Sequence, residues 1–186
     1  MFRMDRPAPL DTKEAEGGCP DMRKALDVIG LPIVCLETGE ELGTVRDILC
    51  DSAWRVRGVL LSEQGWFHPG TCIPSERIHA VGESCLTVTG KDAITSLDRL
   101  ADLPLTGILT GRTKLKGKTV ITASGELLGR LEDVYFSADW EKLVGYELSN
   151  GWLADITEGR KRLSAPPSVI VGEENLIVPD WVRSQA

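Results

Sequence analysis

The sequence has no long hydrophobic run. Its longest stretch free of polar side chains is Val28 to Leu36, nine residues that include Gly30 and Pro32. A helix that spans a membrane needs about 20 mainly apolar residues, so we expect no transmembrane helix. The first 21 residues contain no apolar stretch of signal-peptide length. We therefore expect a cytoplasmic protein.

Histidine is scarce, and cysteine is badly spaced for a metal site. There are two histidines and five cysteines, all in the first half of the chain, and no Cys-x-x-Cys pair. An odd number of thiols confined to one half fits a reducing compartment, where buried cysteines act as small apolar residues. His68, Cys72, His79 and Cys85 are too irregularly spaced for a zinc site. We expect neither a metal nor another cofactor.

An excess of positive charge is also lacking. The 186 residues include 21 Lys and Arg against 28 Asp and Glu, a net charge of −7. A general nucleic-acid binder needs clustered cations that neutralise phosphates, so this class is disfavoured for the chain as a whole. Apolar residues make up 42% and charged residues 26%, the mixture of an ordinary globular protein with a core.

What the sequence does contain is an internal repeat. The sequence Gly-Glu-Glu-Leu-Gly at 39–43 returns as Gly-Glu-Leu-Leu-Gly at 125–129, an offset of 86 residues, and Trp54 and Trp140 keep the same offset. Matches of this kind at a constant offset predict a duplication. We expect a flexible leader over 1–21, copy one over 22–90, a linker over 91–110 and copy two over 111–186.

Each copy has the pattern of β-structure. Short apolar or β-branched runs alternate with turn sequences at intervals of about ten residues, which favours a small barrel or sandwich. The linker differs, because its apolar residues over 92–102 fall at helical spacing until Pro104. We predict an all-β protein of two small tandem barrels joined by one short amphipathic helix, with Ile94, Leu97 and Leu100 buried.

The repeated pattern resembles the PRC-barrel family, named after the cytoplasmic domain of the photosynthetic reaction centre H subunit. The resemblance rests on the Gly-Glu-x-Leu-Gly motif, on the following Val45 and Asp47, and on Gly58, Ile73-Pro74 and Val81-Gly82. The family also includes the C-terminal domain of ribosome maturation factors and short stand-alone bacterial proteins. It implies a fold and little about function, because the family hosts unrelated roles. The resemblance covers residues 24–89 and 112–182.

Three departures from the family pattern bear on function. We expect no membrane anchor of the kind a complete H subunit has. Because only 21 polar residues precede copy one, we expect no N-terminal domain of the ribosome maturation type. Copy two has Leu-Ser-Ala-Pro-Pro at 163–167 in place of Ile73-Pro74, so its late strands are expected to be irregular.

The matched glycines and aspartates are interpreted as structural. Strand-like residues follow Gly-Glu-x-Leu-Gly, so the motif predicts a hairpin turn and not a phosphate loop, which would open a helix. Asp47 and Asp133 have no second acid or histidine in their motifs, so we expect them to bind backbone amides at a strand end. The residues of this structural motif are Gly39, Gly43, Asp47, Gly58, Gly125, Gly129, Asp133 and Gly145.

Tryptophans and basic clusters are the candidates for contact with a partner. Matched tryptophans are first a packing device, but tryptophan is also enriched at the centres of protein interfaces. Two basic clusters, at 112–118 and 160–162, are either solvated surface or a site for an anionic partner such as RNA or a membrane face. The candidate partner-binding residues are Trp54, Trp66, Trp140, Trp152, Arg112, Lys114, Lys116, Lys118, Arg160, Lys161 and Arg162.

Catalytic chemistry is not indicated. The sequence shows no set of nucleophile, base and acid that recurs in both copies, and we expect no enzymatic activity. The leading hypothesis is a binding or scaffold protein that mediates protein–protein interaction, as adaptor-like roles in the family imply. Association with RNA or the ribosome through the basic clusters of copy two is the first alternative. Peripheral attachment to a membrane complex, by analogy with the H subunit, is the second.

Overall fold

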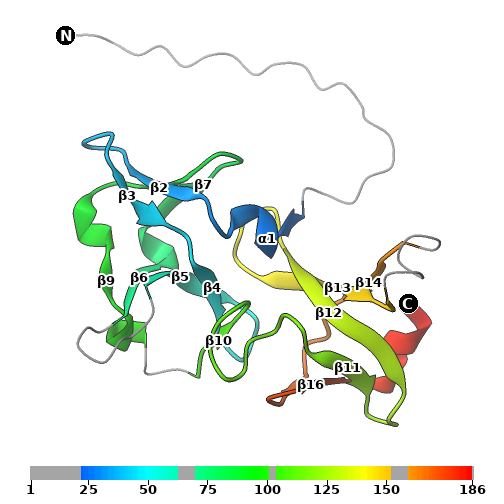
Figure 1. Cartoon of the computed structure of the whole chain (residues 1–186). Coiled ribbons are helices and arrows are strands. Elements are labelled where there is room, and N and C mark those ends of the chain that lie inside the picture. Colours follow the sequence, from blue (N-terminus) through cyan, green and yellow to red (C-terminus); the bar gives the residue numbers. More distant parts are fainter. Residues whose placement is uncertain (1–21, 63–69, 101–103, 152–158, 186) are drawn as a thin grey trace, which may run out of the picture.

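Two β-rich copies lie side by side in the computed structural model and share one hydrophobic core (Figure 1). The structure describes residues 22–62, 70–100, 104–151 and 159–185. No helix within these ranges has the length and hydrophobicity needed to cross a membrane.

Copy one is built from two sheets. One has the order β3 (Glu41–Thr44), β2 (Pro32–Cys35), β8 (Leu86–Val88), β7 (Ile78–Val81). The other has the order β10 (Thr106–Gly107), β4 (Asp47–Cys50), β5 (Val56–Ser62), β6 (Thr71–Pro74), β9 (Thr95–Ser96). A 3-10 turn, η1 (Ser75–Arg77), connects β6 to β7.

Copy two repeats this order in one continuous sheet. Its path is β14 (Lys161–Ser164), β13 (Leu143–Ser149), β12 (Leu127–Phe136), β11 (Thr119–Thr122), β16 (Asn175–Val178), β15 (Ile170–Val171). The long strand β12 replaces both β3 and β4, and the parallel pair of β2 with β8 returns as β11 with β16. The predicted duplication is therefore confirmed at the level of strand pairing. The late strands are short, and β15 has only two residues.

The linker between the copies differs from the predicted α-helix. It forms two 3-10 turns, η2 (Lys91–Ala93) and η3 (Leu97–Leu100), on either side of β9, which pairs with β6. Tertiary pairing of this kind decides the conformation of a segment too short to be a stable helix alone. The expected burial is also wrong, because Ala93 is the buried residue while the predicted apolar face is only half-buried. The half-buried residues are Ile94, Leu97 and Leu100.

The leading segment of each copy packs on the other copy. The leading segment of copy one contains β1 (Arg23–Lys24) and the short helix α1 (Ala25–Val28), and β1 pairs with the end of β12 in copy two. The segment before copy two contains β10, which pairs with β4 in copy one. Strands β4 and the end of β12 are counterparts in the duplication. The exchange is therefore reciprocal, as when two subunits of a symmetric dimer exchange their arms.

Candidate functional site

The two matched tryptophan turns meet where the copies join, and we call this contact the seam. An antiparallel bridge joins Arg55 to Lys142, and the N–H of Leu143 donates to the carbonyl of Trp54 at 2.9 Å. Trp54 and Trp140 both have a positive φ, 61° and 63°. This region is sparsely populated by residues other than glycine. The shared backbone conformation places both indoles in the core at the same point of each copy.

Burial decides what these tryptophans do. Trp54 is 3% exposed and contacts the ring of Tyr146 edge-on, with centroids 6.4 Å apart. Trp140 is 9% exposed and packs at 4.6 Å against Phe136. Neither indole is available to another protein, so the expected tryptophan surface is not present at these two positions. The other two candidate tryptophans, Trp66 and Trp152, lie outside the described residues.

Asp47 connects copy one to the segment that leads into copy two. The side chain is fully buried. Its Oδ1 accepts hydrogen bonds of 3.0 Å from the N–H groups of Ile108 and Leu109. Its Oδ2 accepts a bond of 2.8 Å from the N–H of Thr110 and one of 2.7 Å from the hydroxyl of the same residue. A carboxylate that satisfies this many buried donors fixes the path of the segment.

Asp133 has the same role in the opposite direction. Its Oδ1 accepts bonds from the N–H of Val134 at 2.8 Å and from the N–H of Leu26, in helix α1 of the leading segment of copy one, at 3.3 Å. Burial raises the pKa of this carboxyl, and the two backbone donors act against that rise. Because Asp133 receives fewer donors than Asp47, we infer that it is the weaker of the two connections between copies.

Copy two also buries a charge network that copy one lacks. Glu147 is 3% exposed and accepts hydrogen bonds from the Tyr135 hydroxyl at 2.5 Å and from Arg160 at 2.7 Å, while Lys24 Nζ lies 2.6 Å away. Burial alone raises the pKa of Glu147, but the bonds from Arg160, Lys24 and Tyr135 together lower it to about 2. In copy one the position paired with the motif aspartate holds Leu60 instead. Lys24 belongs to β1, so the network also holds the exchanged segment.

We expect Glu147→Gln to lower the free energy of unfolding by about 2 kcal/mol at pH 7. A carboxylate with a lowered folded-state pKa stabilises the fold above its ordinary pKa, and that stability is lost as the pH falls toward 2. The difference between the wild type and Glu147→Gln should therefore shrink between pH 5 and pH 3 in urea unfolding curves, as the lowered pKa requires. Glu132→Gln, which removes a more exposed ion pair, should change little at any pH. A difference that stays constant with pH would contradict this role.

The first basic cluster does not form a cationic surface. Lys118 is 2% exposed and donates to two backbone carbonyls, at 2.5 and 2.6 Å, so its assignment as a partner-binding residue is wrong. Burial lowers the pKa of Lys118. Arg112 pairs with Glu173 at 2.7 Å, and Lys116 donates to a carbonyl of β12 at 2.8 Å. Arg112 and Lys114 are the exposed cations of the cluster, and Lys114 has no ion pair in the described part of the chain.

The second basic cluster is divided between structure and surface. Arg160 belongs to the buried network of Glu147. The guanidinium of Arg162 lies 5.1 Å from the centroid of the Tyr135 ring, a cation–π distance. Lys161 is exposed at the start of β14 and makes no ion pair with another described residue. Two exposed cations therefore remain at 160–162.

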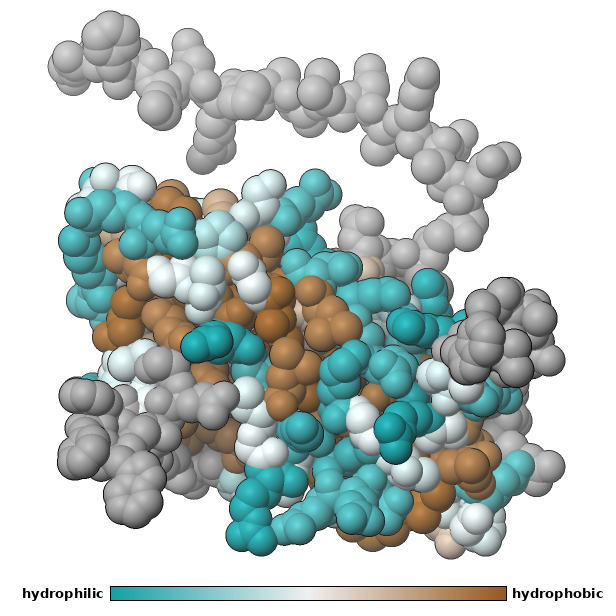
Figure 2. All heavy atoms as spheres, in the orientation of Figure 1, coloured by the Kyte–Doolittle hydropathy of each residue, from teal (hydrophilic) through white to brown (hydrophobic). Residues whose placement is uncertain are grey.

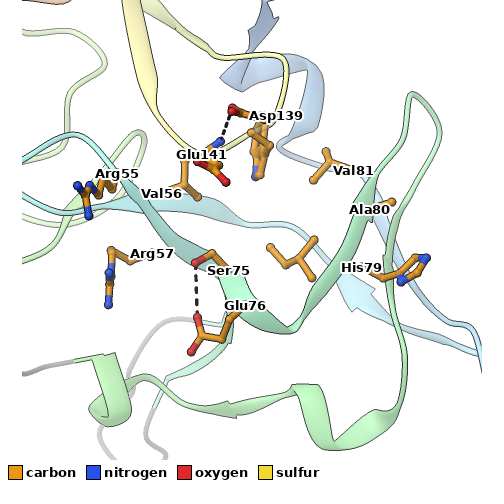
Figure 3. A pocket seen from close by; sticks show the side chains of 12 residues that line it. Arg55, Val56, Arg57, Ser75, Glu76, His79, Ala80, Val81, Asp139 and Glu141 are labelled. Atoms are coloured by element: carbon orange, nitrogen blue, oxygen red, sulfur yellow. Dashed lines mark hydrogen bonds between the residues drawn. The ribbon is translucent and has the colours of Figure 1, made fainter.

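A cleft of about 390 Å³ follows the seam, and both polar and apolar side chains line it (Figure 3). Figure 3 shows Arg55 and Arg57 on one side of it and His79 on the other. Ser75 Oγ lies 3.5 Å from Glu76 Oε2, too far for a base to activate a hydroxyl. Among the described residues no three His, Cys, Asp or Glu side chains gather closely enough to hold a metal ion. The lining of the cleft combines charges of both signs with apolar side chains such as Val56 and Ile78.

A row of aliphatic side chains crosses the outer face of the copy-two sheet, and we call it the aliphatic row. In β11, Val120 and Thr122 are buried and Ile121 points to the opposite face. Ile121 pairs with Leu127 of β12 and with Ile177 of β16. In turn Ile177 pairs with Ile170 of β15. Directly paired residues lie on one face of a sheet, so the row is Leu127, Ile121, Ile177, Ile170.

The ends of this row are exposed. Leu127 is 66% and Ile170 65% exposed, and Ile121 and Ile177 between them are half-buried. Figure 2 shows hydrophobic atoms at the surface at the lower right, where Figure 1 places β11, β12 and β16. Contiguous apolar surface of this kind marks an interaction site more often than scattered single residues do.

Copy one has no aliphatic row at the corresponding pairs. Its strands place Glu41 opposite Val34, Val34 beside Thr87, and Thr87 opposite Ala80. The row is not among the sites predicted from the sequence, although the two matched motifs differ at one of its members. Copy one reads Gly-Glu-Glu-Leu-Gly and copy two reads Gly-Glu-Leu-Leu-Gly, so Leu127 stands where copy one has Glu41.

A cationic cleft adjoins one end of the row. It has a volume of about 570 Å³, and both Leu127 and Leu128 line it. Arg130 and Lys161 supply its charge, and neither makes an ion pair with another residue that the structure describes. No acidic side chain of the described ranges lines it. Aliphatic and cationic side chains thus line the same cleft of copy two.

The fold and these surfaces define a class of protein: two fused β-domains with interlocked leading segments. The model of the PRC-barrel domain matches residues 20–94 and 111–180, so the chain belongs to the PRC-barrel family and carries two copies of the domain. The chain is also similar to the uncharacterized protein YrrD of Bacillus subtilis (strain 168), with 26% identity over 180 residues. The alignment covers 96% of this chain and 97% of YrrD.

Proposed function

We propose that this protein is a non-enzymatic interaction protein that holds a protein partner on the aliphatic row of copy two. The observation that supports this proposal is the exposure of Leu127 and Ile170 at the two ends of a continuous row. An aliphatic row left open to water is favourable to cover, because burying apolar surface releases about 25 cal/mol per Å². The polar counterpart in copy one argues that the row is a specialised feature of copy two and not a requirement of the fold.

The connections between the two copies support a role as an interaction protein. Asp47 and Asp133 each bind backbone amides of the segment that leads into the other copy, and Glu147 holds Lys24 in the same way. These buried acids connect the copies, and none of them lines the clefts described above. The copies therefore form one block that presents the row on a rigid sheet, which limits the entropy lost on binding.

The test compares tagged full-length chains as bait in a native lysate. The wild type is expected to retain one stoichiometric protein partner at low and at high salt. The double variant Leu127→Ser, Ile170→Ser is expected to lose that partner, and Leu36→Ser, which removes an exposed leucine of copy one, is expected to keep it. Equal retention by all three chains, or no stoichiometric partner with the wild type, would refute the proposal.

The same experiment distinguishes RNA association from the binding of a protein partner. RNA or ribosomal proteins that are retained at low salt and lost at high salt, and that disappear in Lys114→Glu with Arg162→Glu, would support RNA association instead. We rank this second because Lys118 is buried while Arg112, Lys116 and Arg160 are engaged within the chain. Attachment to a membrane complex rests on family analogy alone.

A further inference from the structure

We infer that the occupant of the aliphatic row is an acidic amphipathic helix of the partner protein, an inference that rests on the proposed function. Its aliphatic stripe would lie along Leu127, Ile121, Ile177 and Ile170, and its carboxylates would meet Arg130 and Lys161.

The spacing of the row matches one face of a helix. The row crosses four neighbouring strands, β12, β11, β16 and β15. Neighbouring strands lie about 4.8 Å apart, so four strands span about 14 Å. On a helix, side chains at i and i+3 or i+4 advance about 5–6 Å along the axis, and about ten residues cover 15 Å. A helix laid across the strands therefore places one aliphatic side chain near each member of the row.

The charge beside the row selects an acidic helix. Arg130 and Lys161 line the cleft at the Leu127 end, and neither has an ion pair within the described ranges. Charge complementarity raises the rate of encounter and disfavours partners of the wrong sign. A basic helix would bring like charges together at this end. A second copy of this chain would also need to overcome the mutual repulsion of two chains that each carry −7.

The probe is a fluorescein-labelled helical peptide, measured by fluorescence anisotropy with the full chain. It carries leucines at i, i+3, i+7 and i+10, one for each member of the row, with glutamates on both flanks, and a hydrocarbon staple on its outer face keeps it helical. We expect saturable binding of this peptide at micromolar protein. The same peptide with lysines in place of the glutamates should bind about tenfold more weakly at low salt, and added salt should narrow that gap.

Variants of the chain locate the site. Leu127→Ser and Ile170→Ser should each weaken peptide binding about tenfold, because each removes one exposed aliphatic contact. Arg130→Glu with Lys161→Glu should remove the preference for the glutamate peptide. Leu36→Ser and Lys114→Glu, which change an exposed leucine of copy one and an exposed cation outside the cleft, should leave binding unchanged.

Each contrary outcome overturns the inference. These outcomes are no saturable binding at millimolar protein, equal binding of the glutamate and lysine peptides, or equal binding by the row variants. A wild-type dimer that Ile170→Ser disperses would assign the row to a second copy. Binding to phosphatidylglycerol vesicles that depends on Leu127 would assign it to a lipid surface. If retention of the lysate partner requires the row but not Arg130 and Lys161, the proposed function is supported. The inference that the partner supplies an acidic helix is then refuted.

Discussion

Asp47→Ala is expected to lower the free energy of unfolding by about 5 kcal/mol, the largest effect we predict. Truncation removes the acceptor for the N–H groups of Ile108, Leu109 and Thr110, in the segment that leads into copy two, and for the N–H of the adjacent Ile48. Each buried donor left without an acceptor costs about 1–3 kcal/mol. A variant that leaves four backbone N–H groups without this acceptor therefore loses much of the whole stability of an ordinary domain.

Urea unfolding followed by tryptophan fluorescence measures this effect, because Trp54 and Trp140 are buried at the seam. Asp133→Ala is the matched comparison, since its carboxylate accepts only two backbone N–H groups, and its cost should be about half as large. Loss of the Asp47 contacts should also make the linker around Thr110 more susceptible to proteolysis. Equal stability of the two variants would contradict the prediction. It would show that the additional hydrogen bonds of Asp47 do not make it the stronger connection between the copies.

The duplication and the β-fold were accessible from the sequence because they depend on local signals. The Gly-Glu-x-Leu-Gly motif and the matched Trp54 and Trp140 report turns whose residues lie next to one another in the chain. The sequence also suggested that Asp47 and Asp133 bind backbone amides. It did not show that those amides belong to the segment leading into the other copy, because a periodic pattern carries no information about long-range exchange.

The structure of the linker and the burial of the basic clusters depend on tertiary contacts, so the sequence did not predict them correctly. Residues 92–102 have helical spacing, but pairing of β9 with β6 makes part of that segment a strand. Spacing alone also treated Lys118 as a surface cation, although two backbone carbonyls hold its ammonium in the interior. The aliphatic row appeared only when strand register placed Leu127 and Ile170 on one line with two isoleucines. Register is a tertiary property, so composition and periodicity did not reveal it.

Gly58→Ala is expected to cost about 4 kcal/mol, the second largest effect. A Cβ at Gly58 would lie 2.4 Å from the carbonyl oxygen of Ile73 and 3.1 Å from its carbon. Both atoms belong to the backbone of β6, which pairs directly with β5 at this position, so relief requires the two strands to separate. Strand separation breaks ladder hydrogen bonds and opens the core beneath Val59, which is fully buried.

The duplication supplies an internal control for that variant. Gly145 is the counterpart in copy two, but a Cβ there would lie 3.1 Å from the carbonyl oxygen of Leu163 and 3.6 Å from the side chain of Tyr135. A shift of a few tenths of an ångström relieves contacts of this length, so Gly145→Ala should cost about 1 kcal/mol. Urea midpoints of the two variants measure the difference. Equal midpoints would mean that β5 and β6 separate more easily than their close approach implies, and that copy one is no more tightly packed at this crossing than copy two.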